Sequence, residues 1–554
     1  MRSRPPPDAE SAPPGKVTPS LTRRRLLKTA LAGLVSFVAA PGARAARSVQ
    51  TLSGLRLETG RPFAGDSDRL ATIGLDDARR SVLMRFRLAR PAAVTLEVVQ
   101  TGQGVASERP VSSGQTGVAA QTAHFGPGEH ALAWAPQSEP VPDPRTYILR
   151  LTADHAGRTT TMSAVTRVLG VDAAFVEPSS RQGTTTALLI RTDARSLMLQ
   201  MLRCGIETEP TYANNQLNGV PIGQPRLLDW TKRRDAPASV YVTVGRDWPT
   251  GIYCARLDAD DGRVGFAPVV VPPTAPTTRV GVVVPVSTWQ AYNFYDANGD
   301  GWGDTWYARW QTMTVDTFRP HSNRGVPYRF RSYELGFYHW LAQRGIQPDF
   351  YADVDLELFA SPDALRAAYD LLVFPGHTEY VTTTMYDLVE GFRDRGGNLL
   401  FLSANNFFRR VDRSGSRLDL IDEWRDLGRP EAGLCGVQYV ASDRGERHGP
   451  FVVGGAGDAP WAFDGTGLQN GSTFGSYGIE IDARAAVSPP NTVVLASIPD
   501  LLGPSKTAEM TYYEHASGAR VFSAGALNFG GQILLWPQTA RLLENVWARL
   551  SSPA

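Results

Sequence analysis

His377 and Glu379 form the combination of side chains in this chain that is best suited to acid–base or metal chemistry. They follow an apolar run at residues 371–374 and a Pro-Gly turn, a pattern typical of a buried parallel strand that ends at a sheet edge. In open α/β sheets, ligands bind at the carboxyl ends of the strands. This loop could therefore present a metal ligand and a general acid or base to one cleft, although a loop histidine and carboxylate without a task is the alternative.

Three further polar residues are expected near the same edge. A second apolar strand, at residues 398–402, leads to Asn405, whose amide could polarise a carbonyl oxygen or cap a helix. Tyr292 follows the apolar strand at residues 280–285, where an aromatic ring could bind a ligand or simply pack. Glu514 ends a later apolar segment and could supply a second carboxylate or lie in a solvated turn.

A loop rich in oxygen donors comes shortly after Tyr292. Its first, third, fifth and ninth positions are Asp296, Asn298, Asp300 and Asp304, and glycine occupies the sixth position. This spacing resembles a calcium-binding loop, although Tyr307 occupies the twelfth position, where a bidentate glutamate is expected. We therefore keep two interpretations, a calcium site and a plain Asn/Asp/Gly turn.

The elements that position these residues are predicted to form three domains. Residues 46–170 and 171–275 carry short alternating strands separated by Gly, Pro and Ser turns, which predicts two β-sandwich domains of immunoglobulin-like form. In residues 276–554 apolar strands alternate with helices, which predicts a doubly wound α/β domain of the flavodoxin or class I amidotransferase type. The expected fold class is multidomain α+β.

The first 45 residues have the pattern of an export signal. A twin-arginine segment at residues 22–28 precedes an apolar run at 29–40 and the small-residue cleavage site Ala43-Arg-Ala45. The apolar run is too short for a permanent membrane anchor. We expect a periplasmic or secreted protein with no membrane anchor after cleavage; a basic cytosolic tail is the alternative.

Composition excludes several classes of function. With 42% apolar and 20% charged residues, the chain is neither disordered nor a membrane protein. A net charge of +1 lacks the excess of positive charge that is typical of proteins that bind nucleic acid. The three cysteines, Cys204, Cys254 and Cys435, lack C-x-x-C spacing and lie away from the predicted sheet edge, which argues against a zinc knuckle and a thiol mechanism but allows a single disulfide.

Several segments together resemble the C-terminal domain of the large (beta) subunit of N,N-dimethylformamidase. They are STWQAYN at residues 287–293, PGHTEY at 375–380, GGNLLFL at 396–402 with Ala404-Asn405, and RVFSAG at 520–525. Their order and spacing are more specific than any one of them. The similarity covers about residues 249–550, with WPTGIY at 248–253 as its outlying N-terminal piece.

The resemblance implies an amidohydrolase for a small-molecule amide, with one ferric ion held by two tyrosinates and one glutamate. Carried onto this sequence, the iron ligands are Tyr253, Tyr292 and Glu379. The surrounding catalytic residues are His377, Asn405 and Glu514. Hard anionic oxygen ligands suit ferric iron, which would activate water for attack on the substrate carbonyl. The family's large subunit pairs with a small one, so a small partner subunit or a homo-oligomer is expected.

This chain departs from the family in three respects. It carries an export signal, its N-terminal half need not match the N-terminal part of the family, and Val381 stands where an aromatic residue is expected. The first hypothesis is an exported iron-dependent hydrolase of an amide bond. The alternative is a non-catalytic exported binding protein for a glycan or cell-surface ligand on the same scaffold. A third reading is a calcium-stabilised hydrolase of ester or glycan bonds that uses His377 and Glu379 without iron.

Overall fold

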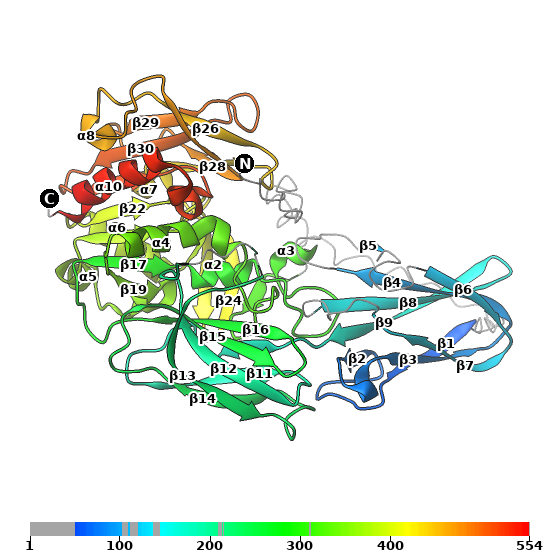
Figure 1. The fold of residues 1–554 in the computed structure, drawn as a ribbon. Helices are drawn as coiled ribbons and strands as arrows, with labels where there is room; N and C mark the ends of the chain where they lie inside the picture. The colour runs from blue at the N-terminus through cyan, green and yellow to red at the C-terminus, as the bar shows by residue number, and fades with distance from the viewer. Residues whose placement is uncertain are drawn as a thin grey trace, which may run out of the picture.

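The computed structural model describes residues 50–101, 109–110, 120–136, 145–208, 213, 215–309 and 312–552. The predicted export signal at residues 1–45 lies outside this range. Strands predominate in the described residues, with shorter helices between them (Figure 1). Among these helices, none has the length and apolar character needed to cross a membrane. The three cysteines are buried and free, so the disulfide that the sequence allowed does not form between them.

Two sheets with a common core make up the chain before residue 170. One sheet contains β1 (Leu52–Glu58), β3 (Val82–Leu88) and β7 (Gly128–Trp134). The other sheet has the order β2 (Leu70–Ile73), β9 (Arg158–Val168), β8 (Arg145–His155), β4 (Ala92–Gln100), β5 (Arg109–Pro110). In addition, β6 (Ala120–Phe125) pairs with β4. Alternate residues of both sheets, such as Phe86 and Leu96, are buried in the core, as the period of two in a strand requires.

A second pair of sheets follows and has its own core. The first contains β10 (Asp172–Phe175), β11 (Thr185–Arg191) and β14 (Ala238–Thr243). The second has the order β13 (Val220–Asp229), β12 (Ser196–Arg203), β15 (Gly251–Ala259), β16 (Val264–Val271). Trp230 and Tyr253 are among the large side chains fully buried in this core.

The C-terminal part is organised around a nine-stranded sheet. Its parallel half has the order β19 (Asp349–Ala352), β17 (Val280–Val284), β20 (Leu371–Phe374), β22 (Asn398–Phe401), β31 (Arg520–Ser523). The sheet continues with antiparallel strands β30 (Ala508–Glu514), β29 (Val493–Ile498), β26 (His448–Val453) and β27 (Thr473–Gly478).

Both faces of the parallel half are covered. Val373 points into a core that contains residues of α4 (Gly336–Gln343) and α10 (Pro537–Ser551). Its neighbour Leu372 points into the opposite core, which contains residues of α5 (Pro362–Ala368) and α6 (Thr383–Arg393). Because both faces are buried, the parallel strands are mostly apolar, which is why β17, β20, β22 and β31 were recognisable in the sequence.

Smaller elements surround this sheet. A four-stranded sheet has the order β18 (Thr314–Asp316), β24 (Arg417–Glu423), β23 (Arg409–Ser414), β21 (Tyr380–Val381), and β25 (Gln438–Ser442) pairs with β28 (Glu480–Ala483). The short helices are α2 (Val286–Ala291), α3 (Trp306–Arg309), α7 (Ala432–Cys435), α8 (Pro460–Phe463) and α9 (Phe529–Gln532). Short 3₁₀ or π-helical segments are η2 (Asp77–Arg79), η3 (Arg331–Leu335), η4 (Asp353–Leu358) and η5 (Ile533–Leu535).

Candidate functional site

The loop after β20 places His377 and Glu379 at the carboxyl edge of the parallel strands, as expected. Gly376 allows the loop to approach η3 closely, since a Cβ there would lie 2.2 Å from Cγ of Glu334. Thr288 of α2 fixes the far end of this loop. Its Oγ1 accepts hydrogen bonds from the backbone N–H groups of Glu379 at 3.1 Å and Tyr380 at 3.3 Å. The side chains of His377 and Glu379 are thereby fixed and almost fully buried.

Three phenols converge on the carboxylate of Glu379. The Tyr292 hydroxyl, at the end of α2, donates to Oε2 of Glu379 at 2.7 Å. The Tyr307 hydroxyl, on α3, donates to the Tyr292 hydroxyl at 2.9 Å and also contacts the Tyr380 hydroxyl. The rings of Tyr292 and Tyr307 stack, with centroids 4.5 Å apart. The result is a compact set of hard oxygen atoms on neighbouring elements.

His377, Asn405 and Glu480 form the adjoining part of the site. His377 Nε2 lies 3.4 Å from Glu379 Oε2 and 3.5 Å from Glu480 Oε2. The Asn405 amide donates to Glu480 Oε2 at 2.8 Å, and its nitrogen lies 3.3 Å from His377 Nε2. Within the described part of the chain, the buried Oδ1 atom of Asn405 has no hydrogen-bond partner. An acceptor left open in this position can bind water or an N–H group of a ligand.

Asn405 is held in an unusual backbone conformation. Its φ is +55°, and its backbone N–H donates to both carboxylate oxygens of Asp482, at 2.8 and 2.9 Å. Asparagine tolerates the left-handed region better than most residues, and such strain is common at functional sites. The helix cap considered from the sequence is not the role seen here, because the side chain points at His377 and Glu480.

Burial dominates the electrostatics of the cluster. It raises the pKa of Glu379 and of Glu480, and repulsion between the two carboxylates raises the pKa of Glu480 further. Arg409, whose Nε lies 3.9 Å from Glu379 Oε1, opposes the increase in the pKa of Glu379. Burial lowers the pKa of His377 to about 3, so its imidazole is neutral at pH 7. A bound cation would reverse the cost of charging these carboxylates and phenols.

The structure does not bring Tyr253 to this cluster. Tyr253 lies on β15 in the core of the second pair of sheets, where its ring stacks on Trp248 with centroids 4.9 Å apart. Its hydroxyl donates to the backbone carbonyl of Pro249 at 2.7 Å. The iron-ligand role expected for Tyr253 is therefore corrected: this residue is a core residue whose hydroxyl is satisfied locally.

Glu514 also lies elsewhere. It ends β30, which runs antiparallel to β31, and it pairs with Arg520 at the beginning of β31. Glu514 is therefore at the amino edge of the parallel strands, opposite the His377 loop. Its Oε1 accepts hydrogen bonds from the Tyr512 hydroxyl at 2.7 Å and from Arg549 at 2.8 Å. The expected catalytic role of Glu514 is corrected accordingly.

Sequence reasoning missed Tyr307, Tyr380 and Glu480. Tyr307 was visible as the residue that interrupts the calcium-like spacing, and Tyr380 directly follows Glu379. No pattern in the sequence around Glu480 indicated a role in this site. It reaches the cluster because Ile481 bridges to Ala526, on the segment that follows β31 at the carboxyl edge.

The predicted calcium loop connects the C-terminal part to the first pair of sheets. Asp296 accepts backbone N–H bonds from Gly299 at 2.6 Å and Gly301 at 2.9 Å, and Asp304 accepts one from Ala297 at 2.7 Å. Trp302 packs in a small core with residues of β4, β8 and β9. The carboxylates of Asp296 and Asp304 thus hold the loop in shape through its backbone N–H groups. Across the described residues, no group of three or more His, Cys, Asp or Glu side chains is arranged to hold a metal.

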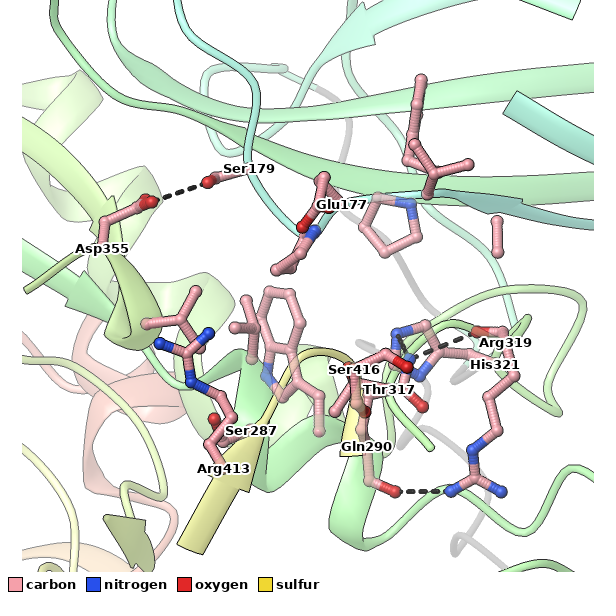
Figure 2. Close-up of a pocket in the computed structure, with 18 of the residues that line it drawn as sticks. Glu177, Ser179, Ser287, Gln290, Thr317, Arg319, His321, Asp355, Arg413 and Ser416 are labelled. Atoms are coloured by element: carbon pink, nitrogen blue, oxygen red, sulfur yellow. Dashed lines mark hydrogen bonds between the residues drawn. The ribbon is translucent and has the colours of Figure 1, made fainter. Parts of the chain in front are cut away.

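A cavity of about 360 Å³ lies on another side of α2, between the second pair of sheets and the C-terminal part (Figure 2). Ser287, Trp289 and Gln290 of α2 line it, and Ser179 donates to Asp355 across it at 2.7 Å. The residues that line this cavity do not include those around Glu379. The two sites are therefore separate.

Residues 227–540 match the family described as N,N-dimethylformamidase beta subunit-like, C-terminal. The chain is 24% identical to the N,N-dimethylformamidase beta subunit of Paracoccus aminophilus and 23% identical to that of Alcaligenes sp, each over 298 residues. Each alignment covers 43% of this chain and 39% of the relative, so the match spans about two fifths of the relatives' length. A solved structure of Salmonella alpha-2-macroglobulin, at 12% identity over 40% of this chain and 17% of that one, has a TM-score of 0.21, too low to support an argument.

Proposed function

Because this chain belongs to the family of N,N-dimethylformamidase beta subunit-like proteins, we propose that it hydrolyses the carbon–nitrogen bond of a small amide. The observation that carries the proposal is the convergence of Tyr292, Tyr307, His377, Glu379, Asn405 and Glu480 within the residues that match the family. Tyr292, Tyr307 and Glu480 are only partly buried, and we propose that a small substrate approaches the cluster from their side.

The oxygen atoms around Glu379 fit the ferric ion that the resemblance implies. Phenolate and carboxylate oxygens are hard donors, which suit a hard cation. We propose that Glu379, Tyr292 and Tyr307 hold the ion, with Tyr307 in the role that the resemblance implied for Tyr253. Bound there, the ion would supply Lewis-acid polarisation of the substrate carbonyl and a lowered pKa for water.

The remaining residues of the site would position the substrate and move protons. The open Oδ1 of Asn405 can accept a hydrogen bond from water or from a substrate N–H group. Burial raises the pKa of Glu480, which favours its protonated form, and Glu480 could give this proton to the leaving amine nitrogen. His377 is neutral and contacts both carboxylates, so it can hold them at a fixed separation.

Metal content and activity test this proposal together. We expect the full chain, prepared without chelator, to contain about one iron per chain, with a visible tyrosinate-to-iron band, and to release amine from at least one member of a panel of small amides. Colourless protein that takes up neither ferric nor ferrous iron and cleaves no amide would contradict the proposal and favour the binding-protein alternative.

We also propose a domain architecture, a cellular location and a partner subunit for this chain. The paired sheets support two immunoglobulin-like sandwiches, and the parallel strands covered on both faces support a doubly wound domain. The sequence of the first 45 residues supports twin-arginine export to the periplasm or beyond. The curated relatives are named as beta subunits, which supports a partner subunit for this chain as well.

We also propose that the loop from Asp296 to Asp304 binds calcium. Burial raises the pKa of Asp296, and repulsion from the carboxylate of Asp304 adds to the increase; a cation would relieve that repulsion. Because Trp302 packs the loop against β4, β8 and β9 of the first pair of sheets, we expect saturating Ca²⁺ to raise the melting temperature by about 2–4 °C. The shift should be absent in Asp304→Asn. An equal shift in both proteins, or none in the wild type, would contradict a calcium site.

A further inference from the structure

Glu334 is a buried carboxyl that the proposed chemistry does not use. Its side chain is 1% exposed, and it belongs to η3, a five-residue π-helical turn that leads directly into α4. Such turns are rare and frequently occur at functional sites. A buried glutamate is costly unless its oxygens are satisfied, so its place in the fold calls for a specific set of contacts.

The contacts of Glu334 join three segments. Its Oε1 accepts a hydrogen bond from Nε1 of Trp289, on α2, at 2.8 Å. Its Oε2 accepts one from the hydroxyl of Tyr338, on α4, at 3.2 Å. Its Cγ fills the space where a side chain on Gly376 would begin, directly before His377. Glu334 therefore touches the helix that carries Tyr292 and the loop that carries Glu379.

The π-helical turn itself is closely confined. Tyr333 packs edge-on against the ring of His377, with centroids 6.1 Å apart. On another side, a Cβ on Gly531 would lie 2.0 Å from the carbonyl oxygen of Ser332, and one on Gly530 would lie 2.8 Å from that of Tyr333. The turn cannot shift without displacing its neighbours, so it is a rigid base for the side chain of Glu334.

We propose that Glu334 is a positioning residue for the oxygen cluster: through Trp289 and Gly376 it fixes α2 against the His377 loop, and so sets Tyr292 against Glu379. The inference rests on the proposed function in so far as the cluster is taken to hold iron. Burial raises the pKa of Glu334 to about 8, so the side chain is largely uncharged at pH 7, and glutamine is a close mimic of it.

The test compares Glu334→Leu with Glu334→Gln in the full chain. Iron affinity is measured by competition with a chelator, together with the position of the visible band. We expect Glu334→Leu to bind iron about 10–100-fold more weakly with a shifted band, because outer residues that orient metal ligands have effects of this size. Glu334→Gln keeps an acceptor for Trp289 and should restore affinity to within a few fold. Trp289→Phe, which removes the donor, should resemble Glu334→Leu.

A second measurement does not need the metal. Hydrogen exchange should become at least about tenfold faster at the backbone N–H groups of Glu379 and Tyr380 in Glu334→Leu, because Thr288 would no longer be held against them. Glu431→Leu is the matched control, since Glu431 is also 1% exposed but precedes α7, where its carboxylate pairs with Arg425 instead of with α2 or the His377 loop. It should lower stability without changing iron affinity or this exchange.

The inference is overturned if Glu334→Leu behaves like Glu431→Leu in the exchange of Glu379 and Tyr380, or if Glu334→Gln is as impaired as Glu334→Leu. Wild-type protein that binds no iron would overturn the proposed function instead. In that event the exchange measurement alone decides whether Glu334 positions the loop.

Discussion

Replacement of Glu379 by glutamine is expected to lower iron affinity more than about 100-fold and to remove the visible band. Glu379 is the only carboxylate that Tyr292 and Tyr307 both contact among the described residues, so the neutral amide would leave a cation with two phenols alone. Residues that only orient a metal ligand already change affinity about 10–100-fold, and loss of the anionic ligand should exceed that. Iron content after dialysis and the visible spectrum measure the effect.

Two variants serve as controls for Glu379→Gln. Glu514→Gln changes a carboxylate at the opposite edge of the sheet, and Tyr253→Phe removes a hydroxyl that donates to the backbone carbonyl of Pro249. Both should keep the iron and the band. If Tyr253→Phe lost the band while Tyr307→Phe kept it, the assignment of Tyr307 as the second phenolic ligand would be wrong.

Replacement of Glu480 by glutamine is expected to lower kcat for amide hydrolysis by about 10²–10⁴-fold while iron remains bound. Positioned proton transfer contributes rate factors of this size, and Glu480 is the carboxyl with a raised pKa beside Asn405. An acid must be protonated to act, so activity in the wild type should fall as the pH rises through the pKa of Glu480. The variant should lack this limb of the pH profile.

Glu514→Gln is again the matched control, because the resemblance implied for Glu514 the role that we propose for Glu480. It should retain wild-type kcat and the full pH profile. Unchanged kcat in Glu480→Gln, with a loss in Glu514→Gln, would show that the proton donor comes from the amino edge and would contradict the site described above.

The two corrections have different physical origins. An apolar run identifies a buried strand but not its direction, since parallel and antiparallel strands bury the same side chains. Glu514 follows such a run and was expected at the carboxyl edge, but β30 is antiparallel to β31 and places it at the other end. Tyr253 was carried over from a short outlying match, and its strand packs into a different core.

The sequence by itself determined the parts of the site that depend on one strand and its following turn. Buried strands followed by Pro-Gly or small polar residues located Tyr292, His377, Glu379 and Asn405, because parallel strands in one sheet end at one edge. Only the tertiary structure decided which other side chains meet them. Tyr307 follows a loop whose spacing indicated calcium rather than this cluster, and Glu480 lies in a segment with no motif. Their contacts depend on how α3 and β28 pack against that edge.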